Sequence, residues 1–293
     1  MAKYGLDLQR KKSNKKPVLF MCFFICLVLL IGTFSAIIFL KHYNYDLENV
    51  FKKEEDSTTE VASTEPINQV TYEGSAVFLV AVTSDDKAET RFINLISTDL
   101  GEKTIKVIPV DDTLKSKTEK QSYSHILSSK GVKELVLALE SDYGVKIDKY
   151  AVFTDTGYKT AFRNMGKSIT VTVSADVEYD TEDMFLELKR GENTLAPEKV
   201  YKYMKYICET SKGIQKSKLN AEIIVSAFNT YFNNETFLSG DSYFSTLINC
   251  CSTDISIVDY TDSKDKIQYL MPKSSKEKLK VYVSKELTDE EKF

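Results

Sequence analysis

The sequence predicts an α/β fold, a mixed β-sheet flanked by helices and preceded by one transmembrane helix. Two observations predict it. In residues 71–293, short apolar strand patterns alternate with stretches in which apolar residues recur every three or four positions, which is typical of α/β layer folds. Ahead of them lies an uncharged apolar run, residues 18–40, that is long enough to cross a bilayer as a helix.

The apolar run, VLFMCFFICLVLLIGTFSAIIFL, has 23 residues. At about 1.5 Å per residue, a helix of this length exceeds the roughly 30 Å hydrocarbon core. Six Lys and Arg residues but one acid precede Pro17, so the N-terminus is expected on the cytoplasmic side. The run continues past Ser35 and Ala36, so we interpret it as an uncleaved signal anchor. The sequence thus predicts a single-pass protein of the cell membrane whose C-terminal domain is extracytoplasmic.

The chain is predicted to have four parts. Residues 1–17 form a basic cytoplasmic tail, 18–40 the signal anchor, 41–70 a flexible tether, and 71–293 the extracytoplasmic domain. The tether is rich in charge, Ser and Thr, and has too few apolar residues to fold alone. The net charge of −4 argues against a nucleic-acid partner, because nucleic-acid binders are usually basic overall or in one region.

Three of the five cysteines, Cys208, Cys250 and Cys251, lie in the outer domain. Adjacent cysteines rarely bridge each other, so the sequence leaves open one disulfide that involves Cys208. The chain has no CxxC pair and only two histidines, so a zinc site would need an unusual ligand set.

Three strands are predicted at the start of the outer domain. The continuous apolar run GSAVFLVAVT, residues 74–83, is the first. RFINLIST and KTIKVIPV, residues 91–98 and 103–110, lie on either side of a turn that contains Gly101. These two segments are therefore expected to pair as a hairpin.

Helix and strand patterns then alternate. TEKQSYSHILSSK and VKELVLALESDYG are predicted as helices, the second because its apolar residues recur on one face. KYAVFTD is the next strand, and the helix GYKTAFRNM is expected to end at Gly166, because glycine accepts the left-handed conformation there.

The remaining elements are less regular. ITVTVSADVEY alternates as a single strand, and LAPEKVYKYMKYI is predicted as a helix that tolerates Pro197 in its first turn. SKLNAEIIVSAFNTYF and FSTLINCC look helical, and two short apolar segments, IQYLM and KVYVS, end the domain.

Two segments carry a family resemblance. GVKIDKYAVFTDTGYKTAFRNMGKSITVTV, which begins at Gly144, has an Ile-Asp-x-Tyr start, a Gly-aromatic step and a Gly before the next strand. LKRGENTLAPEKVYKYMKY, which begins at Leu188, has a Gly-x-x-x-Leu segment that leads into a helix. In this order and behind an anchor, they resemble the LytR-CpsA-Psr family of bacterial cell-envelope proteins, and the likeness runs from about residue 75 to residue 258.

The resemblance implies a LytR-CpsA-Psr-like fold and a role in cell-wall biogenesis. Members of the family are understood to transfer phosphate-linked glycopolymers from a polyprenyl-pyrophosphate carrier to peptidoglycan, so the implied activity is that of a phosphotransferase-like enzyme. The implied machinery is Mg²⁺ held by carboxylates, arginines that grip the pyrophosphate, and an apolar cavity for the lipid tail. The implied partners are the membrane, a polyprenyl-linked glycan or lipid, and peptidoglycan or envelope proteins.

The chain matches this machinery only in part. After the first strand the family has a Ser-Asp-x-Arg-like step, and this chain has Ser84, Asp85, Asp86 and Lys87. The resemblance makes Asp85 a candidate catalytic residue and metal ligand, and Lys87 a candidate phosphate ligand. The alternative interpretation is a polar loop that ends a buried strand.

Arg91 and Phe92 stand where the family has an Asp-Thr pair that helps to bind metal. A cation in place of a metal-binding carboxylate is not a conservative change. We hypothesise that Arg91 replaces Mg²⁺ as the counter-charge of Asp85 or of a bound anion, which makes it a candidate phosphate ligand. The alternative is a surface cation that leads into a strand.

The stretch VIPVDDT ends in two adjacent carboxylates, Asp111 and Asp112, and is either a charged turn or the edge of a site. The Pro-Arg-Asp step of the family falls on residues 109–111 or 111–113, depending on the register, and neither register supplies the arginine. Asp111 and Asp112 are therefore candidate catalytic residues of a site that has lost its arginine.

Lysines stand where the family has arginines in the two helices after Gly191. The candidate phosphate or pyrophosphate ligands there are Lys205, Lys216 and Lys218. Lysine binds phosphate as a point charge and not as a planar fork. The loss of every expected arginine favours a second hypothesis, a non-catalytic binding or scaffold protein of the cell envelope on the same fold.

Overall fold

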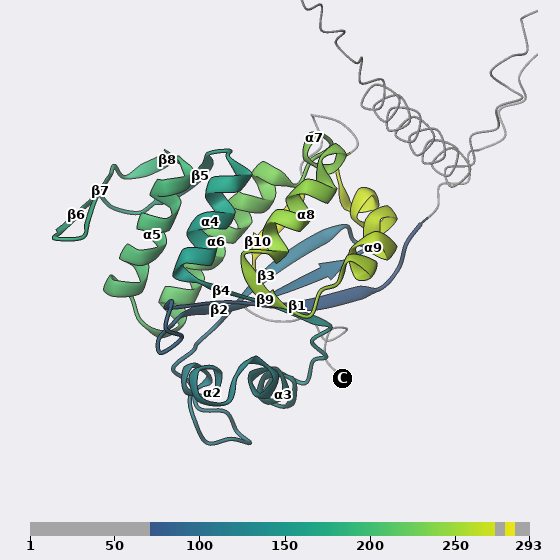
Figure 1. The fold of residues 1–293 in the computed structure, drawn as a ribbon, viewed down its shortest axis with the longest axis horizontal. Coiled ribbons are helices and arrows are strands. Elements are labelled where there is room, and N and C mark those ends of the chain that lie inside the picture. The colour runs from purple at the N-terminus through teal and green to yellow at the C-terminus, as the bar shows by residue number, and fades with distance from the viewer. Residues whose placement is uncertain (1–70, 273–278, 285–293) are drawn as a thin grey trace, which may run out of the picture. The chain divides into compact units, whose positions relative to one another are not determined.

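A six-stranded mixed sheet forms the centre of the structure, a computed structural model that describes residues 71–272 and 279–284 (Figure 1). Its strands lie in the order β10-β3-β2-β1-β4-β9. Their bounds are β1, Ser75–Thr83; β2, Thr90–Asp99; β3, Thr104–Val110; β4, Lys149–Thr154; β9, Cys251–Thr253; and β10, Lys280–Val283. The predicted α/β fold with a mixed sheet is confirmed.

Three of the central strands, β1, β3 and β4, run in the same direction. β1 pairs parallel with β4, and Thr83 lies opposite Thr154 at their carboxyl ends. β2 is antiparallel to both β1 and β3, and the predicted hairpin around Gly101 is confirmed. The carboxyl ends of three strands therefore meet at one edge of the sheet, which is where ligands usually bind in open α/β folds.

Helices cover both faces of the sheet (Figure 1). One face packs against α2, Tyr123–Lys130, and α3, Val132–Tyr143, through an apolar cluster that includes Leu79, Leu135 and Leu139. The apolar face predicted for α3 is thus confirmed. The other helices are α4, Asp155–Met165; α5, Pro197–Thr210; α6, Gly213–Tyr231; α7, Asn234–Leu238; α8, Gly240–Ile248; and α9, Ile257–Leu270.

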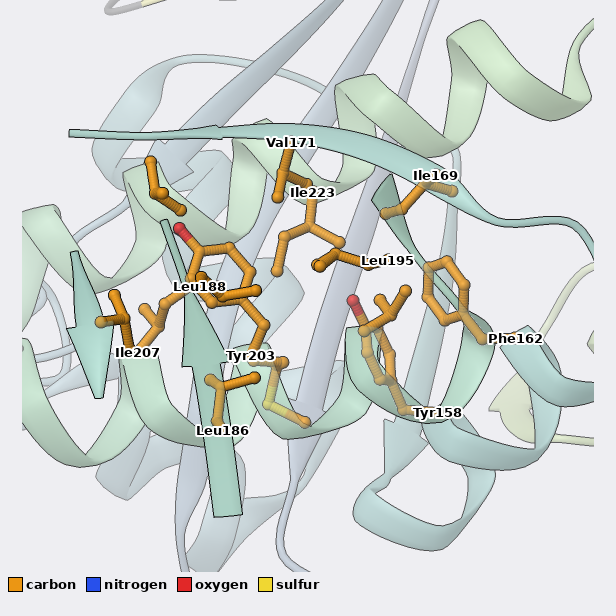
Figure 2. Packing of buried hydrophobic residues seen from close by; sticks show 14 of the residues in the cluster. Tyr158, Phe162, Ile169, Val171, Leu186, Leu188, Leu195, Tyr203, Ile207 and Ile223 are labelled. Atoms are coloured by element: carbon orange, nitrogen blue, oxygen red, sulfur yellow. The ribbon is translucent and has the colours of Figure 1, made fainter. Parts of the chain in front are cut away.

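Two small sheets extend the layer formed by α4, α5 and α6. β5, Ile169–Val173, pairs with β8, Gly191–Leu195, and β6, Val177–Thr181, pairs with β7, Met184–Leu188. Their buried side chains join the three helices in a second apolar cluster, shown in Figure 2. Labelled members are Tyr158, Phe162, Ile169, Leu195, Tyr203 and Ile223.

The prediction of one strand over ITVTVSADVEY is wrong. The chain forms β5 and β6 there, and the two strands belong to different sheets. Val171, Val173 and Val177 are nevertheless buried in the same cluster. The apolar pattern therefore continues across the break while the pairing partner changes from β8 to β7. Periodicity reports which face is buried and not which strand is the partner.

The ends of several elements follow their predicted signals. Gly166 ends α4 in the left-handed region at φ 78°, and Pro197 opens α5. FSTLINCC ends α8 and enters β9, IQYLM ends α9, and KVYVS contains β10. Within residues 71–272 and 279–284 the three cysteines are free, so the disulfide that the sequence left open does not form.

The predicted tail, anchor and tether, residues 1–17, 18–40 and 41–70, lie outside the described residues. In the part of the chain that the structure describes, no helix is both long enough and apolar enough to cross a membrane. The membrane anchor and the topology stay predictions.

Candidate functional site

The carboxyl ends of β1, β3 and β4 bring charged side chains to one edge of the sheet. Asp85 follows β1, Asp111 and Asp112 follow β3, and Asp155 opens α4 directly after β4. Arg91 joins them because β2 runs the other way and begins at this edge. These five residues are termed the carboxyl-end cluster below. The fold thus brings together four residues that the sequence nominated from separate motifs.

Arg91 and Asp155 form a forked ion pair. Arg91 Nη2 donates to Asp155 Oδ2 at 2.7 Å, and Nε donates to Oδ1 and Oδ2 at 3.2 and 3.1 Å. Arg91 Nη1 donates to Glu89 Oε2 at 2.7 Å. The Arg91 and Asp155 side chains are only 17% and 10% exposed, so water screens this pair weakly. The hydrogen bond to Asp155 raises the pKa of Arg91, and the guanidinium is permanently charged.

Asp85 takes the anion position at the N-terminus of α4. Thr154 caps this helix, and its hydroxyl accepts from the Gly157 N–H. The Thr156 N–H donates to Asp85 Oδ1 at 2.8 Å, and the Thr156 hydroxyl donates to Oδ2 at 2.8 Å. These bonds favour the ionised carboxylate and hold the pKa of Asp85 below its ordinary value. A helix N-terminus attracts anions, and here it already holds a carboxylate of the protein.

Lys87 lies in the turn between β1 and β2. Its backbone is left-handed at φ 61°, its N–H donates to the Ser84 carbonyl at 2.9 Å, and the residue is exposed. The Ser84 hydroxyl donates to Asp86, and the Glu89 N–H donates back to that hydroxyl. The stretch after β1 is therefore an ordered polar turn, and only Asp85 of its acids contacts α4 in these bonds.

Asp112 and Lys216 form a buried ion pair between the end of β3 and α6. Lys216 Nζ donates to Asp112 Oδ2 at 2.8 Å and to the Thr90 carbonyl at 3.3 Å. The Asp112 and Lys216 side chains are 3% and 11% exposed. Burial raises the pKa of Asp112, and Lys216 opposes that rise. The ammonium thus ties α6 to the residue that precedes Arg91.

Asp111 has a different role from its neighbour. Its Oδ1 accepts from the Thr113 N–H at 3.0 Å and from the Thr113 hydroxyl at 2.6 Å. Its carboxylate also lies against Gly213, the first residue of α6, where a Cβ would come within 3.1 Å of both oxygens. VIPVDDT is thus both a turn and the edge of the cluster: Asp111 shapes the turn and Asp112 supplies a buried charge.

The other two lysines each act on a glutamate one turn further along their own helix. Lys205 Nζ lies 3.9 Å from Glu209 on α5. Lys218 is exposed on α6, one turn before Glu222. Burial raises the pKa of Glu222, and the charge of Lys218 opposes that rise. Of the five lysines and arginines that the sequence nominated, Arg91 and Lys216 are the two that hydrogen-bond to aspartates of the carboxyl-end cluster.

Sequence reasoning missed Asp155, Thr156 and Tyr201. Like Asp85, Asp155 is a carboxylate that follows a strand, but its partner Arg91 is 64 positions away. Only the parallel pairing of β1 with β4 brings the two segments together. Burial raises the pKa of Tyr201 on α5, and the nearby charge of Asp155 raises it further. Tyr201 therefore borders the cluster.

The implied Mg²⁺ does not fit these residues. Both oxygens of Asp155 accept from Arg91, so a metal ion on this carboxylate would have to displace the guanidinium. Mg²⁺ prefers near-octahedral oxygen ligands at about 2.0–2.1 Å. The guanidinium of Arg91 already lies against Asp155 on the side where such an ion would bind. Within the described residues, no group of three or more His, Cys, Asp and Glu side chains is arranged to hold a metal ion.

A family model and several solved structures match this chain. The model of the LytR_cpsA_psr family matches residues 51–289. A search of curated proteins gives no match. A solved protein of Eubacterium siraeum DSM 15702 is 21% identical, covers 78% of this chain and 90% of its own, and has a TM-score of 0.63.

Two further solved structures are similar. B. subtilis TagV is 18% identical over 72% of this chain and 85% of its own, with a TM-score of 0.59. TagT, in a structure bound to LI-WTA, is 15% identical over 72% of this chain and 78% of its own, with a TM-score of 0.52. At these identities the three structures show a shared fold.

Proposed function

Because the chain belongs to the LytR_cpsA_psr family, we propose that it is a cell-envelope protein that binds a polyprenyl-linked glycopolymer without transferring it. One observation carries the proposal. Each cationic group in or against the carboxyl-end cluster is already neutralised by a carboxylate of the protein: Arg91 by Asp155, Lys216 by Asp112, and the N-terminus of α4 by Asp85.

Transfer from a pyrophosphate carrier needs free positive charge. As the bond to the leaving group breaks, negative charge develops on the pyrophosphate, and metal ions or guanidinium groups must stabilise it. Here the cations are held in internal pairs, and Glu89 adds a further carboxylate beside Arg91. The cluster therefore lacks the surplus of positive charge that would lower the barrier to transfer, which supports binding over catalysis.

The second apolar cluster (Figure 2) includes residues that are next in sequence to this charged edge. Phe92, the residue after Arg91, and Val82, two residues before Ser84, both belong to it. The relative TagT was solved bound to LI-WTA, which supports a ligand of the cell envelope for this chain as well.

Native mass spectrometry of the full-length protein, purified in detergent from its own membranes, tests the proposal. We expect a co-purified polyprenyl-linked glycan and no transfer when peptidoglycan and Mg²⁺ are added. In Arg91→Ala the charge of Asp155 is left unpaired and repels the phosphate of the ligand. We expect this variant to retain roughly tenfold less ligand, which corresponds to about 1.4 kcal/mol.

Lys218→Ala is the matched control, because it removes an exposed cation of the same candidate set and leaves the carboxyl-end cluster intact. It should retain the ligand as the unaltered protein does. Protein that carries no lipid-linked glycan in any preparation would refute the binding function. Transfer of the glycan to peptidoglycan would instead establish the family's enzymatic activity.

We also propose that residues 18–40 anchor the chain with residues 1–17 in the cytoplasm and 71–293 outside. The basic residues before the apolar run support this orientation. An epitope tag at the C-terminus should be labelled by antibody on intact spheroplasts, and one at the N-terminus only after the membrane is permeabilised. The reverse labelling pattern would overturn the orientation, and a tag recovered in the soluble fraction would overturn the anchor.

A further inference from the structure

We propose that Arg91 is a built-in substitute for a divalent cation, so that the carboxyl-end cluster works without metal. Asp155 and Asp85 are the two carboxylates that a cation at this edge would have to neutralise. The proposal deepens the proposed function, because it says which charge faces a phosphate-linked ligand. The metal binding that it predicts is a property of the protein itself and does not require a bound glycan.

The guanidinium holds a bridging position. Two of its nitrogens donate to Asp155 at the start of α4, and the third donates to Glu89 in the turn before β2. A metal ion would join carboxylates of different segments in the same manner. The planar guanidinium donates hydrogen bonds only in fixed directions. Because it is covalently attached to the chain, it cannot exchange with solvent as a bound ion does.

The charges at the edge point to the same conclusion. A divalent cation on Asp155 would lie close to a guanidinium that is permanently charged, and the two cations would repel each other in a weakly screened site. Arg91 also acts on Asp85 at longer range and contributes to the lowering of its pKa. One fixed cation therefore acts on three carboxylates, on Asp155 and Glu89 by hydrogen bonds and on Asp85 at longer range, as a bridging ion with a single positive charge would.

The N-terminus of α4 locks the arrangement. Asp85 is held by both donors of Thr156, and Asp155 is the first residue of the same helix. The Asp85 carboxylate and the backbone of Asp155 are thus held by one helical turn whose bonds do not involve Arg91. Removal of the guanidinium should leave a pair of pre-positioned carboxylates that attract a divalent cation.

Binding of Mn²⁺, a paramagnetic probe for a magnesium site, tests the inference by electron paramagnetic resonance on the full-length protein in detergent. We expect the unaltered protein to bind Mn²⁺ no more tightly than Asp155→Asn. Arg91→Asp, which puts a further carboxylate beside Asp85, Asp155 and Glu89, should gain one saturable site at least about tenfold tighter. That site should disappear in Arg91→Asp/Asp155→Asn and should be displaced by Mg²⁺.

Arg91→Gln and Arg91→Lys complete the design. Arg91→Gln frees Asp155 without adding charge and should gain a weaker site, whereas Arg91→Lys keeps a cation and should gain none. Circular dichroism selects variants that are folded. One Mn²⁺ bound tightly by the unaltered protein and lost in Asp155→Asn would overturn the inference, and so would folded Arg91→Asp and Arg91→Gln variants that gain no site. Neither result depends on whether a glycan co-purifies.

Discussion

Replacing Lys216 with methionine is expected to lower the free energy of unfolding by about 3–5 kcal/mol, because it leaves the buried carboxylate of Asp112 without its counter-charge. The Asp112 side chain is 3% exposed, and its second oxygen has no hydrogen-bond partner among the described residues. Lys216 is its bonded cation. Urea denaturation of the purified protein measures the loss.

A double-mutant cycle separates the pair from the packing of the lysine stem. Asp112→Asn combined with Lys216→Met removes both charges, so the double variant should lose clearly less than the sum of the two single losses. Lys205→Met on α5 is the control, because its pair with Glu209 spans 3.9 Å and is more exposed. It should cost at most about 0.5 kcal/mol. Additive losses at residues 112 and 216 would contradict the coupling.

The effect of Lys216→Met should also depend on pH. Burial raises the pKa of Asp112, and without Lys216 the opposing effect is gone. The folded variant would then keep a proton on Asp112 that the unfolded chain releases above its ordinary pKa of 3.8. The folded state binds more protons in that window, so the stability of the variant should fall as pH rises through it. The deficit should therefore be smaller near pH 4 than near pH 7.

Gly157→Ala is expected to cost about 2–3 kcal/mol, because the new Cβ has no room. A Cβ at this position would lie 2.2 Å from the backbone carbonyl oxygen of Cys250, which cannot swing aside as a side-chain tip can. Alanine is ordinarily better than glycine in a helix by about 1 kcal/mol, so a net loss reports the collision directly. Thermal and urea denaturation of the variant measure it.

The same substitution should disturb the carboxyl-end cluster. Gly157 follows Thr156, whose two donors hold Asp85, so a shift of the first turn of α4 moves that carboxylate. Gly101→Ala is the control, since its Cβ would meet only a side-chain oxygen of Asp99 at 3.5 Å. It should change stability by less than about 0.5 kcal/mol. A Gly157→Ala protein as stable as the original would show that α4 and the segment before β9 are not in contact in solution.

Part of the central sheet could be predicted, because the signals of the β2–β3 hairpin are local. Gly101 marks a turn between two apolar runs, and Gly166 marks the end of a helix, so the hairpin and α4 follow from short stretches of sequence. The small sheets could not be predicted in this way. Val173 and Val177 face the same cluster, and the change of partner between them depends on where β7 and β8 lie in the folded chain.

The sequence identified most residues of the site but not the hydrogen bonds and ion pairs between them. Asp85, Asp111 and Asp112 follow buried strands, which is a pattern that the sequence displays. The partner of Arg91 was not visible, because Asp155 becomes its neighbour only through the parallel register of β1 and β4. The burial of Lys216 was likewise hidden, since its place on α6 gives no sign that Asp112 lies opposite.

The pairing of β3 with the outermost strand, β10, has a consequence for how the chain folds. All seven residues of β3 are buried, and its outer side is paired by β10, which joins in parallel from almost the other end of the sequence. Such a long-range pairing forms late, because the intervening loop must close first. Until Val281 and its neighbours arrive, the outer side of β3, a strand of high β-propensity, has no partner, so β10, the last strand among the described residues, protects it from self-association.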